Sequence, residues 1–191
     1  MIVSPPRMTQ DRHQQRLPMV VPERPLGNHG HVRTLIGDLV EDMSAALLGG
    51  VRHKCSSQAD YCPDVSVDLP HGRVFVECKA AGRNRETFIY EGRLEKDRLF
   101  TADRPLFYCV VHHGTDTTQA DTVEDLQRRF FRNLRCLYLV PFEVIDGLCR
   151  GREPEALNSG YGGTDRKTYG SGFRLKLRDF EPWLLMDFAQ W

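Results

Sequence analysis

Three ionisable side chains in the first half of the chain, Asp64, Glu77 and Lys79, have the types needed to hold a metal ion and act on a phosphate group. Carboxylate oxygens suit Mg²⁺, which keeps several waters and takes only one or two protein carboxylates while substrate phosphate completes its shell. A bound divalent ion acidifies a water molecule and neutralises charge that develops on a phosphate. Lys79 could orient that water, act on its proton or stabilise the same charge. These residues therefore predict a site for Mg²⁺ or Mn²⁺.

Residues 63–79, which contain these side chains, are predicted to form a β-hairpin. Apolar and polar side chains alternate on both sides of the Pro-His-Gly segment at 70–72, which favours a turn. The start of the first strand then lies beside the end of the second, so Asp64 approaches Glu77 and Lys79. Because side chains alternate across a strand, Glu77 and Lys79 share one face. The hairpin thus brings two carboxylates and an amine together at one end.

The pattern Pro63-Asp64 followed by Glu77-Cys78-Lys79 resembles the signature of the PD-(D/E)XK nuclease superfamily. The resemblance implies that Asp64 and Glu77 bind the metal. It implies further that the backbone carbonyl of Cys78 adds a ligand and that Lys79 assists the attack of water. The fold implied is α/β and restriction-endonuclease-like, with an αβββαβ core in which a mixed β-sheet is flanked by helices. An isolated Glu-x-Lys triplet, by contrast, is usually a solvated ion pair on an exposed strand.

Residues 31–48 carry apolar side chains at helical spacing and end at a Gly-Gly pair, which predicts the first helix. Glu41 lies off the main apolar face, on a second stripe with small residues that would allow another element to approach. The resemblance implies that a carboxylate of this helix completes the metal site, and Glu41 is the candidate. A solvated helix charge is an equal alternative, and Asp38 and Asp42 are competing acids.

The remaining apolar patterns alternate between strands and helices. They predict a strand at 51–56, a helix at 84–100, a buried strand at 105–111, a helix at 121–135, a strand at 136–140 and a short helix at 142–149. With the first helix and the hairpin, this order matches the αβββαβ core. Other α/β folds share such alternation, but the chain lacks both Gly-rich phosphate-binding loops of nucleotide-binding folds.

Within the predicted helix at 84–100, Arg93 and Lys96 lie on one face between the apolar Ile89 and Phe100. Long cationic side chains often lay their stems on a core and extend the charge to water. In the resembling family, the helix after the Glu-x-Lys strand sends polar side chains toward the phosphate. Arg93 and Lys96 are therefore candidates for binding nucleic acid.

Length and composition place few limits on function. The 191 residues suit one domain with an arm, and 26 basic residues balance 26 acidic ones, so only a local basic surface could hold nucleic acid. The six cysteines lack Cys-x-x-Cys spacing and suit reduced, buried thiols. No membrane-length apolar run or signal-peptide pattern is present, so a soluble, intracellular, cytoplasmic protein is expected.

Three regions follow from these patterns. Residues 1–29 are rich in proline and predict an irregular arm, and residues 30–150 hold the nuclease-like core. Residues 151–191 combine a Gly-rich basic loop with a strand that packs on the core. No boundary is marked by a low-complexity linker.

The resemblance implies a metal-dependent nuclease that hydrolyses phosphodiester bonds, with DNA as the expected substrate. Recombination, repair, restriction and phage enzymes all fit, as do endonucleases and exonucleases, and duplex, branched, single-stranded and RNA substrates stay open. A homodimer is expected because cutting both strands needs two sites. Two alternatives stay open: a catalytically silent nucleic-acid-binding or assembly protein on the same fold, and a metallohydrolase that uses His112 and His113.

Cationic and aromatic residues gather after the core, in and just beyond a Gly-rich stretch that resists regular structure. Cations there could follow a phosphate backbone while an aromatic ring stacks on a base or sugar. The alternative is a solvated loop and an amphipathic edge strand protected by charge. The candidates for nucleic-acid binding are Arg166, Lys167, Tyr169, Arg174 and Lys176.

Replacing Arg166 and Lys167 together by alanine should weaken binding of every DNA sequence to a similar extent. Removing two phosphate contacts should also reduce the slope of log affinity against log salt concentration by about 2. Affinities measured at several salt concentrations, for the double variant and the wild type, test this expectation. An unchanged slope and affinity would identify the stretch as a solvated loop.

Overall fold

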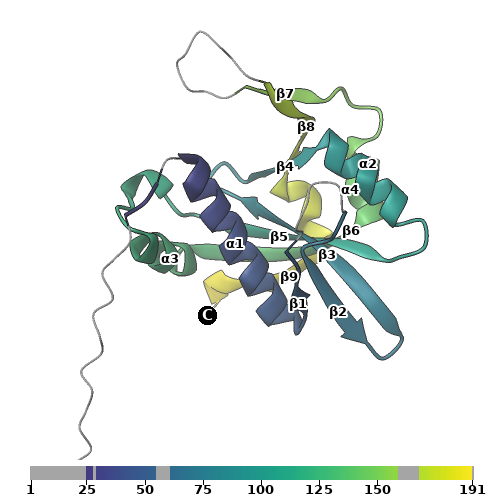
Figure 1. Cartoon of the computed structure of the whole chain (residues 1–191), viewed down its shortest axis with the longest axis horizontal. Coiled ribbons are helices and arrows are strands. Elements are labelled where there is room, and N and C mark those ends of the chain that lie inside the picture. The colour runs from purple at the N-terminus through teal and green to yellow at the C-terminus, as the bar shows by residue number, and fades with distance from the viewer. Residues whose placement is uncertain (1–24, 28, 55–60, 159–167, 191) are drawn as a thin grey trace, which may run out of the picture.

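The computed structural model describes residues 25–27, 29–54, 61–158 and 168–190 (Figure 1). The four helices are α1 (His29–Leu48), α2 (Glu91–Phe100), α3 (Val123–Arg132) and α4 (Phe142–Cys149). The strands are β1 (Val51–Arg52), β2 (Val65–Leu69), β3 (Gly72–Ala81), β4 (Glu86–Tyr90), β5 (Leu106–His113), β6 (Leu134–Pro141), β7 (Glu155–Asn158), β8 (Thr168–Lys176) and β9 (Leu184–Asp187). Short 3-10 helices occupy Thr117–Gln119, Leu177–Trp183 and Phe188–Gln190.

The main sheet has six strands in the order β1-β2-β3-β5-β6-β9. β3 and β5 run parallel, with Glu77 paired to Tyr108, whereas the other neighbouring strands are antiparallel. The parallel pair is joined by a crossover through β4 and α2, as parallel strands require. The sheet is therefore mixed, which confirms the predicted α/β class with helices flanking a mixed sheet.

The predicted hairpin is present as β2 and β3. Val65 pairs with Val76 at one end and Leu69 with Gly72 at the other, next to the turn. Gly72 has a φ of 136°, a conformation that favours glycine because it has no Cβ. The short turn fixes the register, and the alternation of side chains then decides which residues face each side of the sheet.

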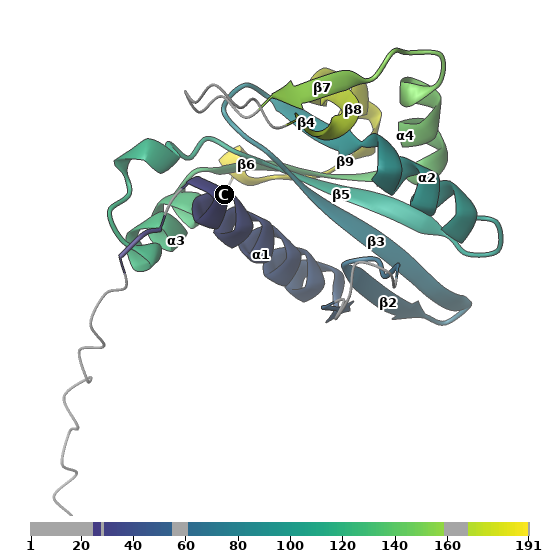
Figure 2. The same ribbon diagram turned by 45° about the horizontal axis from the view of Figure 1, so that its top comes forward.

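Two layers cover the sheet on opposite faces (Figure 2). Val76, Cys78 and Cys109 pack in one core with residues of α1 and α3, whereas Tyr108 and Val110 pack in the other with residues of α2 and α4. Consecutive residues of β5, such as Tyr108 and Cys109, therefore belong to different cores, as the period of a strand requires. Cys78 faces α1, while Glu77 and Lys79 face the α2 side, in agreement with the sequence prediction.

Two predicted elements near the hairpin differ from the structure. The strand expected at 51–56 is limited to Val51–Arg52, and part of its predicted length lies outside the described residues. The helix expected at 84–100 is wrong in its first half, where β4 precedes α2. Thr87, Phe88 and Ile89 are β-branched or aromatic and pair with β8, and this pairing outweighs their helical spacing with Arg93.

β4, β8 and β7 form a second, three-stranded sheet in that order, beside α2 and α4 (Figure 2). The alternating segment after the Gly-rich stretch buries Phe173, Leu175 and Leu177, as the sequence predicts. β8 is nevertheless the central strand of this sheet, so the prediction of an edge strand is wrong. After it, β9 returns to the main sheet and pairs with β6.

The ends of the predicted core also differ slightly from expectation. Residues 1–24 of the predicted arm lie outside the described residues, whereas Pro25 forms a β-bridge with Thr122. The amide of Leu26 donates to the carbonyl of Asp121 at 3.1 Å, which ties the entry to α1 to the start of α3. Among the described residues, no helix is long and apolar enough to cross a membrane.

Gly172→Ala should loosen the second sheet. A Cβ at Gly172 would lie 2.3 Å from the carbonyl oxygen of Ile89 and 2.6 Å from the ring of Phe88, so β4 and β8 would have to move apart. We expect a loss of about 1–3 kcal/mol in the free energy of unfolding, measured with urea. Gly92→Ala on α2 is the matched control, because nothing lies within 4 Å of its Cβ, and its stability should be unchanged or slightly higher. Equal stability of the two variants would contradict the close approach of the strands.

Candidate functional site

Asp64 lies at the start of β2, where the hairpin pairing would next place it across from Glu77. Its Oδ2 accepts a hydrogen bond of 2.7 Å from the backbone amide of Cys78, so its carboxylate is fixed against the β3 strand. Burial raises the pKa of Asp64, while the nearby Lys79 lowers it less strongly. The predicted convergence of Asp64 with Glu77 and Lys79 is therefore present.

Glu77 is the most buried group of the site, with 3 % of its side chain exposed. Lys79 Nζ lies 2.5 Å from its Oε1, and Arg93 Nη2 of α2 donates to its Oε2. Burial raises the pKa of Glu77, although Lys79 and Arg93 act against that shift. One buried carboxylate is thus held between two cations from different elements.

Lys79 keeps its charge in this environment. Burial alone would lower the pKa of Lys79, but the carboxylates of Glu77 and Asp64 raise it above its ordinary value. A protonated ammonium has donors and no acceptor, so it orients a water molecule or stabilises negative charge. In this arrangement Lys79 is a hydrogen-bond donor and not a base.

Arg93 is brought to the site by the first turn of α2. Its guanidinium carbon lies 4.3 Å from the centre of the Tyr61 ring, and its Nη2 also donates to the carbonyl of Cys62 at 3.2 Å. The structure therefore places Arg93 with Glu77, while its binding of nucleic acid stays a prediction. Lys96 is exposed on α2 and does not line the pocket beside Arg93.

Glu41 of α1 reaches the same region from the opposite layer. Its side chain is 24 % exposed, and Arg52 Nε donates to its Oε2 at 2.7 Å. Burial raises the pKa of Glu41, while Arg52 lowers it. Arg52 binds the competing acids Asp38 and Asp42 as well, so all three candidate carboxylates of α1 share one arginine.

A pocket of about 370 Å³ opens over these groups. Its walls come from α1, the β1 end, α2 and the segment before β2, and of Asp64, Glu77 and Lys79 only Asp64 lines it. It is lined by Asp38, Glu41, Arg52, His53, Lys54, Cys62, Asp64 and Arg93.

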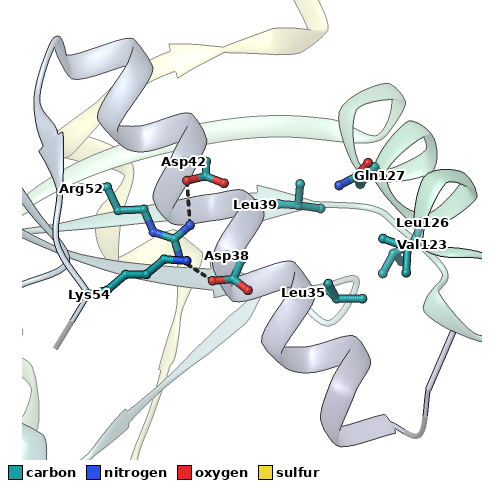
Figure 3. A pocket seen from close by; sticks show the side chains of 9 residues that line it. All are labelled: Leu35, Asp38, Leu39, Asp42, Arg52, Lys54, Val123, Leu126 and Gln127. Atoms are coloured by element: carbon teal, nitrogen blue, oxygen red, sulfur yellow. Dashed lines mark hydrogen bonds and ion pairs between the residues drawn. The ribbon is translucent and has the colours of Figure 1, made fainter. Parts of the chain in front are cut away.

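A second pocket of about 200 Å³ lies between α1 and α3 and shares Asp38, Arg52 and Lys54 with the first. Figure 3 shows the Arg52 guanidinium between Asp38 and Asp42, with Leu35 and other apolar side chains of α1 and α3 farther along the wall. The arginine therefore stands at the border of two pockets. Its charge offsets the acids of α1 beside the site.

The donor set fits a divalent metal through two carboxylates. Mg²⁺ and Mn²⁺ prefer oxygen ligands, and Mg²⁺ usually takes only one or two protein carboxylates, which Asp64 and Glu77 supply. Glu77 is buried and Asp64 half-buried, and the pKa of both is raised, so an added positive charge would favour their ionised form. In the part of the chain that the structure describes, no three His, Cys, Asp or Glu side chains group as a metal site.

Cys78 can contribute only its backbone to such a site. Its side chain packs in the core beneath α1, in register with Cys109 of β5, whose thiol lies 3.2 Å from the hydroxyl of Ser44. Burial raises the pKa of the Cys78 thiol well above its usual range. The thiol therefore stays protonated and is neither a ligand nor a nucleophile.

His112 and His113 do not form a joint metal site. They are consecutive residues of β5, so their side chains point to opposite faces of the sheet. His113 packs against Phe130 at a ring distance of 5.3 Å, whereas the pKa of His112 is lowered by burial and by the nearby Arg85 and Arg135. This separation argues against the predicted His-based alternative.

The C-terminal candidates do not reach the pocket where they are described. Arg166 and Lys167 lie outside the described residues, and of Tyr169 only the backbone, within β8, is described. Arg174 forms ion pairs with Glu86 at 3.4 Å and Glu155 at 3.3 Å. Lys176 is exposed on the same strand, and neither it nor Arg174 lines the pocket.

Sequence reasoning missed Tyr61, Asp97 and Arg52. Asp97 is the i+4 neighbour of Arg93 on α2, a spacing that could have marked it as a partner. Tyr61 and Arg52 carried no such signal, because they meet the site from segments with no repeating pattern.

Comparison with known proteins adds no further assignment. No protein-family model, no curated protein and no solved structure matches the chain. Functional inference therefore depends on the residues and on their geometry.

The pH dependence of stability should report the burial of His113. Its side chain is 5 % exposed, and burial lowers its pKa to about 4, with His112 adding to the shift. In the unfolded chain the pKa is about 6.5, so between pH 6.5 and 4 the unfolded state binds a proton that the folded state rejects. Stability should fall by up to about 3 kcal/mol over that interval and be unaffected by His113 above it.

His113→Gln removes this titration while keeping a polar side chain of similar size. The free energy of unfolding of wild type and of His113→Gln is measured with urea from pH 7.5 to 4.5. The stability gap, which is the difference between the two values, should change so that the variant becomes relatively more stable as the pH falls. The other groups titrate in both proteins, so the gap isolates His113. A gap that stays constant with pH would contradict the lowered pKa.

Proposed function

We propose that this chain is a Mg²⁺- or Mn²⁺-dependent nuclease of the PD-(D/E)XK type, which hydrolyses phosphodiester bonds in DNA. The observation that carries the proposal is the convergence of Asp64, Glu77 and Lys79 at one end of the β2–β3 hairpin. The motif alone is weak, but here Glu77 is buried, which raises its pKa, and the half-buried Asp64 lines a pocket and comes close enough to Glu77 to raise that pKa further. An exposed ion pair on a strand would not have this environment.

The order and direction of the elements support a restriction-endonuclease-like core. α1, the three strands β1 to β3, α2 and β5 follow the αβββαβ order, with β4 as an added strand. β3 lies in the middle of the sheet, antiparallel to β2 and parallel to β5. The candidate residues therefore stand on rigid central strands, and Arg93 approaches them from the helix that follows.

Each residue then has a defined task. Asp64 and Glu77, with the carbonyl of Cys78, would hold the metal, which when bound acidifies a water molecule and neutralises charge on the phosphate. Lys79 as an ammonium orients the attacking water or stabilises the developing charge. Arg93, which can form two parallel hydrogen bonds, suits a phosphate oxygen pair. Glu41 would assist at the metal site only if its ion pair with Arg52 breaks.

We further propose that the nuclease acts as a homodimer on duplex DNA in the cytoplasm. Two sites are needed to cut two strands, and each chain supplies one. Repair, recombination, restriction and phage enzymes all fit this chemistry.

One observation favours a catalytically silent DNA-binding or assembly protein instead. Glu77 is already held by Lys79 and Arg93, and Glu41 by Arg52, so two of the acids carry cations as partners. A protein that no longer binds metal would stabilise its buried acids in this way. The intact set of Asp64, Glu77 and Lys79 supports the enzyme.

Asp64→Asn, Glu77→Gln and Lys79→Met should each reduce cleavage by about 100-fold or more, because each removes a charge that acts in the transition state. The assay uses plasmid, single-stranded DNA and a four-way junction, each with Mg²⁺, Mn²⁺ or EDTA. Asp68→Asn is the matched control, since Asp68 is an exposed acid of the same hairpin paired with Arg73. It should retain full activity.

Full activity in any of the three site variants would contradict the assignment. Wild-type protein that binds these DNAs but cleaves none of them would favour the silent alternative. Stoichiometric zinc, with activity lost when His112 and His113 are replaced, would favour the His-based hydrolase.

A further inference from the structure

Asp97 of α2 is a charged residue with no exposed surface. The hydroxyl of Tyr61 donates to its Oδ1, and the hydroxyl of Tyr108 donates to its Oδ2. Tyr61 lies just before β2, and Tyr108 lies on β5 directly beside Glu77 in the register of the sheet. One buried carboxylate thus joins a helix, a strand and the segment that leads to Asp64.

The third partner of the Asp97 carboxylate is Arg93, one helical turn earlier. Arg93 Nε forms an ion pair with Asp97 Oδ1 at 3.3 Å without a hydrogen bond, while its Nη2 donates to Glu77 and to the carbonyl of Cys62. The Tyr61 ring covers the face of the same guanidinium. The guanidinium of Arg93 is therefore held at Nε by Asp97 and across its face by Tyr61, and its Nη2 reaches Glu77.

Stability alone does not explain this cluster. A buried ionic network is commonly neutral or unfavourable compared with well-packed apolar residues of the same volume. Apolar residues at these positions could join the neighbouring core, which already contains Leu94 and Val110. A long arginine side chain has many rotamers, however, and a tether selects the one in which the guanidinium meets Glu77. The need to position Arg93 explains the buried charge of Asp97 better than a contribution to packing does.

We propose that Asp97 is a positioning residue of the nuclease site, which acts through Arg93 by fixing its guanidinium where the scissile phosphate must lie. The inference rests on the proposed nuclease function. Asp97 touches neither substrate nor metal, and Tyr61 and Tyr108 hold it in the orientation that Arg93 requires. Loss of the tether should therefore affect substrate placement and not only folding.

The test is a double-mutant cycle with Asp97→Asn and Arg93→Gln, read in two ways. The first is the affinity for a short DNA duplex in EDTA, without metal, and the second is single-turnover cleavage with Mg²⁺. We expect Asp97→Asn to weaken binding and to slow cleavage by about 10- to 100-fold, as a small misplacement of a catalytic contact does. In the Arg93→Gln background the same change should have almost no further effect on either quantity.

Asp146→Asn is the matched control. Asp146 is also a buried acid, and it ties α4 to α2 through Arg98 at 2.7 Å, but it has no contact with Arg93. It should lower the melting temperature to an extent similar to Asp97→Asn while leaving DNA affinity and cleavage close to wild type. Tyr61→Phe, which removes one hydroxyl and keeps the ring over Arg93, should lower cleavage in the same direction by a smaller factor.

Four results would overturn the inference. If Asp97→Asn and Arg93→Gln have additive effects, or if Asp97→Asn behaves like Asp146→Asn, Asp97 only supports the fold. If Asp97→Asn does not fold, Tyr61→Phe provides the test instead. Unchanged DNA binding and cleavage in Tyr61→Phe would then reject the positioning role of Asp97. A wild type that cleaves no DNA rejects the nuclease function together with this inference, whereas an active wild type with additive variants rejects the inference alone.

Discussion

The structure around the site depends on the burial of one negative charge, that of Glu77. A carboxylate removed from water is strongly unfavourable unless it is paired and hydrogen-bonded. Lys79 from the same strand and Arg93 from α2 supply one donor for each oxygen. The charge can therefore be buried only if β3 and α2 keep their relative positions. This requirement links a local motif to the packing of the whole layer.

The position of α2 depends in turn on residues far along the chain. α2 begins directly after β4, and β4 pairs with β8, where Ile89 lies across from Phe173. The hydroxyl of Ser171 also donates to Glu91 in the first turn of α2. The C-terminal segment thus fixes the helix that carries Arg93. It affects the site through packing, even though its described cations lie outside the pocket.

The hairpin and its acids could be predicted because the information is local. Alternation over a few residues and a short turn set the register, and the register places Asp64 across from Glu77. The helix expected at 84–100 failed for the opposite reason. Ile89 and Arg93 have helical spacing, but the strand character of β4 is decided by β8, which comes much later in the sequence.

Side chains that meet from several elements were equally hard to predict. Tyr61, Asp97 and Tyr108 come from a loop, a helix and a strand, and no sequence pattern connects them. Arg52 was missed because the predicted strand around it gave no hint that three acids of α1 would converge on it. Glu41, by contrast, was predicted at the site because small residues share its helical stripe. Periodicity thus identifies faces of single elements, but not the partners that a face will meet.

The charges around the pocket explain how a neutral protein could attract an anion there. Asp38, Glu41 and Asp64 line the pocket together with Arg52, Lys54 and Arg93, so acids and bases are balanced at its wall. A phosphate backbone would gain less from this wall than from cations alone, because Arg52 and Arg93 already pair with carboxylates. A divalent ion bound at Asp64 and Glu77 would tip this balance to positive and would offer Lys79 and Arg93 an anion other than Glu77. On the proposed function, metal binding and phosphate binding are therefore coupled through the same buried carboxylate.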